Sequence, residues 1–244
     1  MLNLTNEWNK LIRKRSTIVL FCLSAIFPLL VGPAVQTMQN RFGFTAFDGE
    51  SFPLVILKIA VSFYLPLLLA LGISDMFSGE QEQKTISFLL VRPLSRFKLF
   101  ASKIVCTGIY LLILLFIICV SALFTGAIWL ENFTFHGFLL GISSFLLSWF
   151  PLMAVSMLLI FLAQWFGSSS KALTFSILLY LVMVVITYLF PNIAQWLPVY
   201  DNDWYQRWIN SGLNITIIGR TIYLLSFYTL FYTLSYYKFS QKEY

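Results

Sequence analysis

The sequence predicts an all-α integral membrane protein with six transmembrane helices. Hydrophobic residues make up 59% of its 244 residues and charged residues only 11%, whereas soluble domains carry about 25% charged residues. So little charge cannot cover the surface of a soluble domain. Long charge-free runs alternate with short charged segments, and a spanning helix needs roughly 20 apolar residues. A bilayer is therefore the expected environment of the whole chain.

Six stretches are long and apolar enough to span a membrane. Four are free of charged residues, and the last contains only Arg220, near its start. The second contains Lys58, whose long side chain can carry its ammonium to the lipid headgroups. We expect one transmembrane domain, residues 1–244, with these spans: 16–36, 53–74, 104–129, 138–163, 172–190 and 218–237.

The orientation follows from the distribution of Lys and Arg. With the N-terminus in the cytoplasm, the inner segments hold 12 of these residues and the outer segments hold 3. This is the asymmetry of the positive-inside rule. We therefore expect a multi-pass protein of the cell (plasma) membrane with both termini cytoplasmic. The asymmetry also explains the net charge of +6 without a nucleic-acid partner.

Residues 3–15 are predicted to form an amphipathic helix that lies in the plane of the membrane interface. Leu4, Trp8, Leu11 and Ile12 fall on one side of this helix, and basic residues including Arg13 fall elsewhere. The apolar run that follows is long and lacks a small-x-small cleavage site at a convincing distance. We therefore read residues 3–15 as leading into a retained first span.

Residues 75–103 form a polar segment that is longer than a simple connection requires. Ser78 and Gln81 have the spacing of a capping box, which predicts that a short helix begins at Ser78. Pro93 ends this helix, because the residue before a proline disfavours helical geometry. One face of the short helix is apolar: Ile86, Leu89 and Leu90.

A second helix is predicted after Pro93. Ser95 is placed to cap it, and it carries Arg96, Lys98 and Lys103 into the third span. Two interpretations of the whole segment stay open. The short helix either lies flat on the lipid surface or serves as a docking element for a soluble partner.

The same segment resembles the permease subunits of type-2 ABC transporters. The resemblance rests on an acidic residue after span two, a threonine, a leucine pair, the Pro-x-Ser-Arg pattern and a lysine that enters span three: Glu80, Thr85, Leu89, Leu90, Pro93, Ser95, Arg96 and Lys103. The sequence departs from the family pattern at Lys84, where the family usually has glycine. The opening NEWNKLIRKRS also resembles the family's N-terminal elbow helix, here carried by Trp8, Leu11, Ile12 and Arg13.

The resemblance implies a mechanism. In this family the loop carries a coupling helix that seats in a cytoplasmic ABC ATPase dimer, and two permeases, either two copies or this chain and a paralogue, form the substrate pathway in the bilayer. The implied ATPase-coupling residues are Glu80, Lys84, Thr85, Leu89, Leu90, Pro93, Ser95, Arg96, Lys98 and Lys103.

The chain itself has no ATPase motif. It lacks GxxxxGK[ST], and the nearest string, GSSSKALT from Gly167, lacks the second glycine. We therefore expect ATP and Mg²⁺ to bind to a partner subunit, and neither a cofactor nor a metal to bind to this chain. A catalytic role is not expected, because no span contains a histidine that would act as a base. The lone His136 is expected at the outer interface.

The leading hypothesis is an ATP-driven exporter permease. The apolar, aromatic-rich spans suit an amphipathic cargo such as a peptide antibiotic. The alternative is a membrane scaffold or sensor that transports nothing and docks a soluble partner through the same loop. A permease should co-purify with an ATPase and change its turnover, whereas a scaffold should leave that turnover unchanged.

Two further segments predict packing features. Small residues share one face of the fourth span, which favours close packing against another helix of the same chain: Gly137, Gly141, Ser144 and Ser148. Between spans five and six, Trp204, Trp208 and Ile209 lie on one face of a predicted helix. This helix could rest in the outer leaflet. The resembled family often has short re-entrant helices at this place, so the resemblance favours a re-entrant helix over a plain loop. Asp201 and Asp203 alone are a weak indication of a cation site.

Overall fold

The computed structural model describes residues 2–42, 48–82, 95–212 and 214–241, and within these ranges it is helical without β-strands. Six helices are long and apolar enough to cross a membrane, which confirms the six expected spans. Each predicted span overlaps one of them. They are α2 (Arg15–Phe42), the composite helix Phe52–Glu82, α7 (Arg96–Trp129), α8 (Phe135–Ala163), α9 (Ser169–Leu189) and α12 (Ile215–Gln241).

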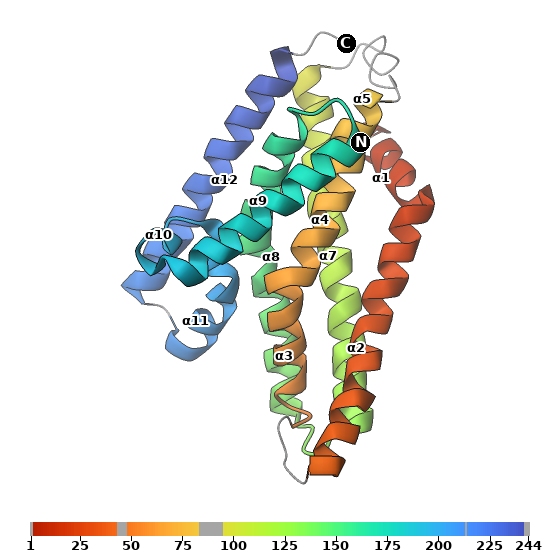
Figure 1. Ribbon diagram of the computed structural model, residues 1–244, viewed down its shortest axis with the longest axis vertical. Helices are drawn as coiled ribbons and strands as arrows, with labels where there is room; N and C mark the ends of the chain where they lie inside the picture. Colours follow the sequence, from red (N-terminus) through yellow and green to blue (C-terminus); the bar gives the residue numbers. More distant parts are fainter. Residues whose placement is uncertain (1, 43–47, 83–94, 213, 242–244) are drawn as a thin grey trace.

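The six helices form an elongated bundle (Figure 1). α2 and α12 run along opposite sides of the bundle, and α7 and α8, the two most buried spans, lie between them. A short helix, α1 (Leu2–Arg13), precedes α2 and lies at the same end of the bundle as the last turn of α12. We call this end the α1 end.

The second span is one helix from Phe52 to Glu82, and two of its turns are π-helical instead of α-helical. Its parts in order are α3 (Phe52–Ile59), η1 (Ala60–Tyr64), α4 (Leu65–Ser74), η2 (Asp75–Gly79) and α5 (Glu80–Glu82). The predicted capping box is therefore wrong: Ser78 lies inside η2 and starts no helix. Its hydroxyl donates to the carbonyl of Ala163 at 2.6 Å, which ties this helix to the end of α8.

Pro66 explains how α9 and the 3₁₀-helix η3 (Pro198–Asp203) attach to the first π-helical turn. A proline has no N–H, so the carbonyl of Ser62, four residues earlier, loses its helical donor. The hydroxyl of Tyr180 on α9 donates to this carbonyl at 2.8 Å. The side chain of Asn202 donates to the neighbouring carbonyl of Val61 at 3.3 Å and to the oxygen of Tyr180 at 3.3 Å. Both of these backbone carbonyls thereby have hydrogen-bond donors.

Three short elements join α9 to α12: α10 (Pro191–Ala194), the 3₁₀-helix η3 (Pro198–Asp203) and α11 (Trp204–Ser211). Trp204 is buried, and its ring lies 5.3 Å from that of Phe150 on α8. The apolar face of α11 thus packs on α8. The guanidinium of Arg207 lies 3.0 Å from the buried carboxylate of Asp201, so this candidate cation ligand is paired with an arginine instead.

The small face of α8 packs inside the chain, as the sequence predicted. A Cβ added at Gly141 would lie 3.1 Å from Leu123 of α7 and 3.6 Å from Pro53 of α3. Ser144 and Ser148 are fully buried one and two turns further along. Small side chains therefore let three helices approach each other at this position.

α2 meets α7 through an equally close contact. The γ-methyl group of Thr125 fills the space beside Gly32, and a Cβ added there would overlap it. The hydroxyl of Thr125 donates to the carbonyl of Ser121 at 2.6 Å, one turn back on its own helix, which fixes the orientation of the methyl group. The glycine is therefore required by the distance between the two helices.

Gly32→Ala should destabilise the protein by about 1–3 kcal/mol, the usual cost of overpacking. The companion variant Thr125→Ser removes only the overlapping methyl group and keeps the hydroxyl. The double variant should recover most of the loss, measured as the thermal unfolding temperature in detergent. Equal stability of wild type and Gly32→Ala, or no rescue by Thr125→Ser, would contradict this packing.

Candidate functional site

The residues predicted to couple to an ATPase divide into two groups. Lys84, Thr85, Leu89, Leu90 and Pro93 lie outside the described residues. The remaining five lie at the α1 end, at the two bases of the loop: Glu80 ends the second span, and Ser95, Arg96, Lys98 and Lys103 begin α7.

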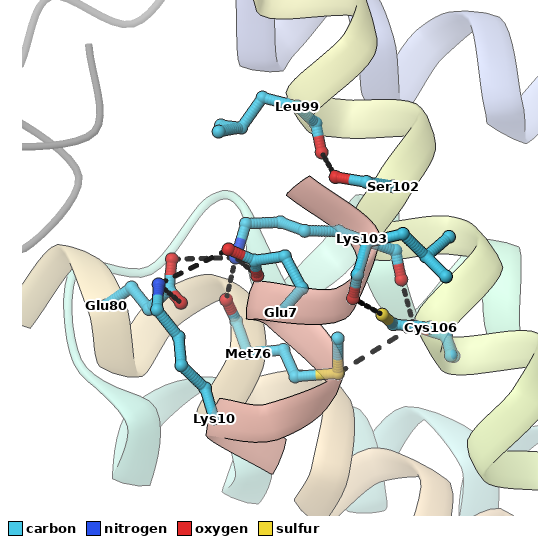
Figure 2. Close-up of polar contacts among 10 residues, drawn as sticks. Glu7, Lys10, Met76, Glu80, Leu99, Ser102, Lys103 and Cys106 are labelled. Atoms are coloured by element: carbon cyan, nitrogen blue, oxygen red, sulfur yellow. Dashed lines mark hydrogen bonds and ion pairs between the residues drawn. The ribbon is translucent and has the colours of Figure 1, made fainter. Parts of the chain in front are cut away.

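Lys103 is buried although it carries a charge (Figure 2). Its Nζ lies 3.0 Å from a carboxylate oxygen of Glu7 and 2.7 Å from one of Glu80. It also donates to the carbonyl of Met76 at 3.1 Å. An ammonium group has three N–H donors, and here each has an acceptor. The acceptors come from α1, η2 and α5, so one side chain of α7 joins three other elements.

A second lysine completes the arrangement. Lys10 of α1 lies 3.2 Å from the other oxygen of Glu7 and 3.4 Å from the other oxygen of Glu80. Two cations and two carboxylates therefore balance in charge. Removing an ion from water costs several kcal/mol, and only well-placed partners offset this cost. We call these four residues, Glu7, Lys10, Glu80 and Lys103, the ion-pair network.

The turn that supplies Met76 and Glu80 is the second π-helical turn. A π-helical turn bonds residue i to residue i+5, so it widens the helix and changes the direction of its carbonyls. In η2, the carbonyl of Met76 faces Lys103 (Figure 2). The irregular turn therefore supplies a backbone acceptor to a buried cation. The ring of Phe77, with its centroid 5.7 Å from Nζ, gives a further favourable contact.

Two more carboxylates of the same stretch contact other helices. Asp75 lies 2.7 Å from Nζ of Lys14 and accepts a 2.7 Å hydrogen bond from the hydroxyl of Ser169. Glu82 accepts a 3.0 Å hydrogen bond from the backbone N–H of Ser169, the first residue of α9. Carboxylates favour this position because the first N–H groups of a helix lack helical acceptors and carry partial positive charge. Residues 75–82, which we call the acidic turn, thus bind α1, α7 and α9.

The pKa of Glu7 reflects its surroundings. Burial by itself raises the pKa of this carboxyl, but the ammonium groups of Lys103 and Lys10 outweigh burial and hold the pKa below its ordinary value. Glu7 is therefore ionised at neutral pH. Its negative charge, together with that of Glu80, allows Lys103 to be buried as a cation.

The start of α7 connects the loop to the last span. Ser95 caps α7, as predicted, by accepting a hydrogen bond from the backbone N–H of Lys98 at 3.4 Å. The guanidinium of Arg96 donates to the carbonyl of Ser240 near the end of α12. The side chain of Lys98 is exposed. Arg96 and Lys103 thus make contacts within the chain, whereas Lys98 faces outward.

The predicted interface residues of α1 do not all lie on its outer side. Leu11 is buried and Trp8 is half-buried, while Ile12 and Arg13 are exposed. The buried side of α1 also includes Glu7, which sequence reasoning overlooked. Glu7 lies three residues after Leu4 and four before Leu11, the spacing of one helical face. A carboxylate inside an apolar face was the signal that would have revealed it.

Lys103→Met should lower the free energy of unfolding by about 3–5 kcal/mol, because it leaves two carboxylates with one exposed lysine between them. Lys98→Met is the matched control. It removes an exposed lysine from the same helix and should change stability by less than about 0.5 kcal/mol. Thermal unfolding of the purified variants measures both. Equal losses in the two variants would contradict a stabilising role for the network.

The contribution of Glu7 should depend on pH with a defined sign. Its folded-state pKa lies below the unfolded value of about 4.3, so its stabilisation is complete above that pH and is lost as the pH falls through the lowered value. Glu7→Gln should therefore be less stable than wild type at neutral pH, and the difference should shrink below about pH 4. Melting curves across this range, in which the two proteins keep a constant difference, would contradict the assignment.

Comparison with known proteins agrees with this architecture. The family model described as ABC-2 family transporter protein matches residues 3–187, from α1 into the last turn of α9, which is 185 of the 244 residues. A comparison with curated proteins found no match. The family is a membrane component of transporters and is not itself catalytic. With six apolar helices and a family match over most of its length, this multi-pass membrane protein belongs to the ABC-2 transporter family.

Proposed function

We propose that this chain is the permease subunit of an ATP-driven exporter in the plasma membrane. Segment 75–103 docks a separate cytoplasmic ATPase dimer, which binds ATP and Mg²⁺, and both termini of the permease lie in the cytoplasm. Two permeases, either two copies of this chain or this chain and a paralogue, enclose the substrate pathway. The family match supports the transport role and implies a partner ATPase.

The observation that carries the docking proposal is the ion pair between Glu80 and Lys103. These residues lie at the two bases of the predicted loop, and their charged atoms are 2.7 Å apart. Any displacement of the loop therefore acts on the second and third spans together. A loop that only connected two helices would not need its bases joined by a buried charge.

The same contacts offer a path for motion into the rest of the bundle. Glu7 links Lys103 to α1, and Glu82 links the acidic turn to the start of α9. Closure of the ATPase dimer around the loop would move the acidic turn, and α1, α7 and α9 would follow. A closely packed cluster joined by hydrogen bonds and ion pairs transmits such a displacement because it is hard to compress or deform.

We propose an amphipathic cargo, for example a peptide antibiotic. An apolar groove of about 480 Å³ between α7 and α8 supports this choice. Its lining includes Phe116, Phe124 and Phe138, and no charged side chain contributes to it. Such a groove suits the apolar part of a molecule and gives a hydrated ion no ligand.

Leu89→Glu combined with Leu90→Glu should abolish co-purification of the ATPase, because two carboxylates would replace the apolar face expected to enter its cleft. Stimulation of ATP turnover by the permease should disappear with it. The measurements are affinity purification from cells that express both subunits and ATPase activity in reconstituted vesicles. Thermal stability of the permease should stay within about 0.5 kcal/mol of wild type.

The matched control is Ile193→Glu combined with Trp196→Glu. It introduces the same charges at two exposed apolar residues of the connection between α9 and α12. This control should assemble normally and support turnover. If the Leu89/Leu90 variant still binds the ATPase, docking through the loop is wrong. If wild type binds a soluble partner but leaves its ATP turnover unchanged, the chain is a scaffold or sensor instead.

A further inference from the structure

A cavity of about 320 Å³ lies beside the ion-pair network, between α1, the start of α2 and the α4–η2 stretch. Its rim is charged and its floor is apolar. Lys10, Arg13 and Lys14 contribute cations to the rim, and the floor includes Leu20, Leu71 and Tyr110. Neither the family match nor the proposed coupling role assigns a ligand to this cavity.

The rim retains unused hydrogen-bond donors that suit an anion. Among the described residues, Arg13 has no ion-pair or hydrogen-bond partner, so its guanidinium offers a full set of N–H groups. Lys14 bonds one carboxylate, that of Asp75, and keeps two further N–H donors. In contrast, both oxygens of Asp75 already accept a bond, from Lys14 and Ser169.

The charge balance points in the same direction. Three carboxylates line the cavity, from Glu7, Asp75 and Glu80. The three cations of the rim, together with Lys103 behind it, exceed them by one positive charge. An arginine presents a planar fork of donors that matches the oxygens of a phosphate group. The site therefore favours a phosphate over a cation.

The apolar surface next to the cavity indicates whether the phosphate belongs to a lipid or to a soluble molecule. The cavity borders the first turns of α2, where Ile18, Val19 and Leu23 are exposed on the outside of the bundle. A bound phosphate would thus lie at the level where the apolar surface of a spanning helix begins. A soluble anion gains nothing from this surface, whereas acyl chains can pack along it.

We propose that this cavity binds the phosphate headgroup of a bilayer lipid, with its acyl chains along α2. Arg13 and Lys14 hold the phosphate, and the floor formed by Leu20, Leu71 and Tyr110 packs against the glycerol and the first methylene groups. Basic pockets between spanning helices bind anionic lipid headgroups for the same reason. The bound lipid would contact both α1 and α2 and so stabilise their relative position beside the ion-pair network.

Native mass spectrometry of the purified chain, titrated with short-chain phosphatidylglycerol, tests this site. Arg13→Gln should weaken binding about fivefold, the effect of one basic residue near anionic lipid. Arg13 is exposed and outside the ion-pair network, so this variant should fold normally. Ser16→Leu, which fills the cavity without changing its charge, should weaken binding as well.

Arg15→Gln is the matched control, because Arg15 is exposed, neighbours the cavity in sequence and does not line it. It should bind lipid as wild type does. Equal weakening by Arg13→Gln and Arg15→Gln would show general surface attraction and overturn the site. Unchanged binding in both Arg13→Gln and Ser16→Leu would overturn it as well. Competition by inorganic phosphate at the same concentration as the lipid would overturn the lipid as the source.

Discussion

The burial of the Lys103 ammonium group is the constraint on which the α1 end of the molecule depends. A cation removed from water needs a hydrogen-bond acceptor for each of its N–H groups. No single neighbouring helix supplies all three, so α1 contributes Glu7, the π-helical turn contributes the carbonyl of Met76, and α5 contributes Glu80. The positions of these elements are therefore interdependent: moving any one of them leaves a buried charge without a partner.

In the middle of the bundle, buried backbone carbonyls likewise need hydrogen-bond partners from other parts of the chain. Pro66 removes the N–H that would have satisfied the carbonyl of Ser62, and Tyr180 of α9 donates to that carbonyl instead. Asn202 of η3 donates to the neighbouring carbonyl of Val61. In both regions an irregular turn of the second span is bonded by side chains from elsewhere in the chain. The second span thus serves as the element to which α1, α9 and η3 attach.

These attachments give the proposed coupling a physical basis. The acidic turn lies at one base of the predicted loop and bonds to α1, α7 and α9 within a few ångströms. α12 joins the same end through Arg96 and through aromatic contacts, among them Phe100 with Tyr232, whose ring centroids are 5.5 Å apart. A lipid in the neighbouring cavity would add the bilayer itself to this assembly.

The sequence by itself determined the six spans, the small face of α8 and the cap at Ser95, because each depends on hydrophobic length, side-chain size or local capping within a few residues. It identified Glu80 and Lys103 by resemblance but gave no indication that they bond to each other across a loop. Only the tertiary structure decided that pairing, the roles of Glu7 and Asp75, and the place of Ser78 inside a π-helical turn. A charge is recognisable from sequence, but its partner is chosen by which helices lie side by side, and contacts such as Lys103 with Glu7, 96 residues apart, exist only after the bundle has packed.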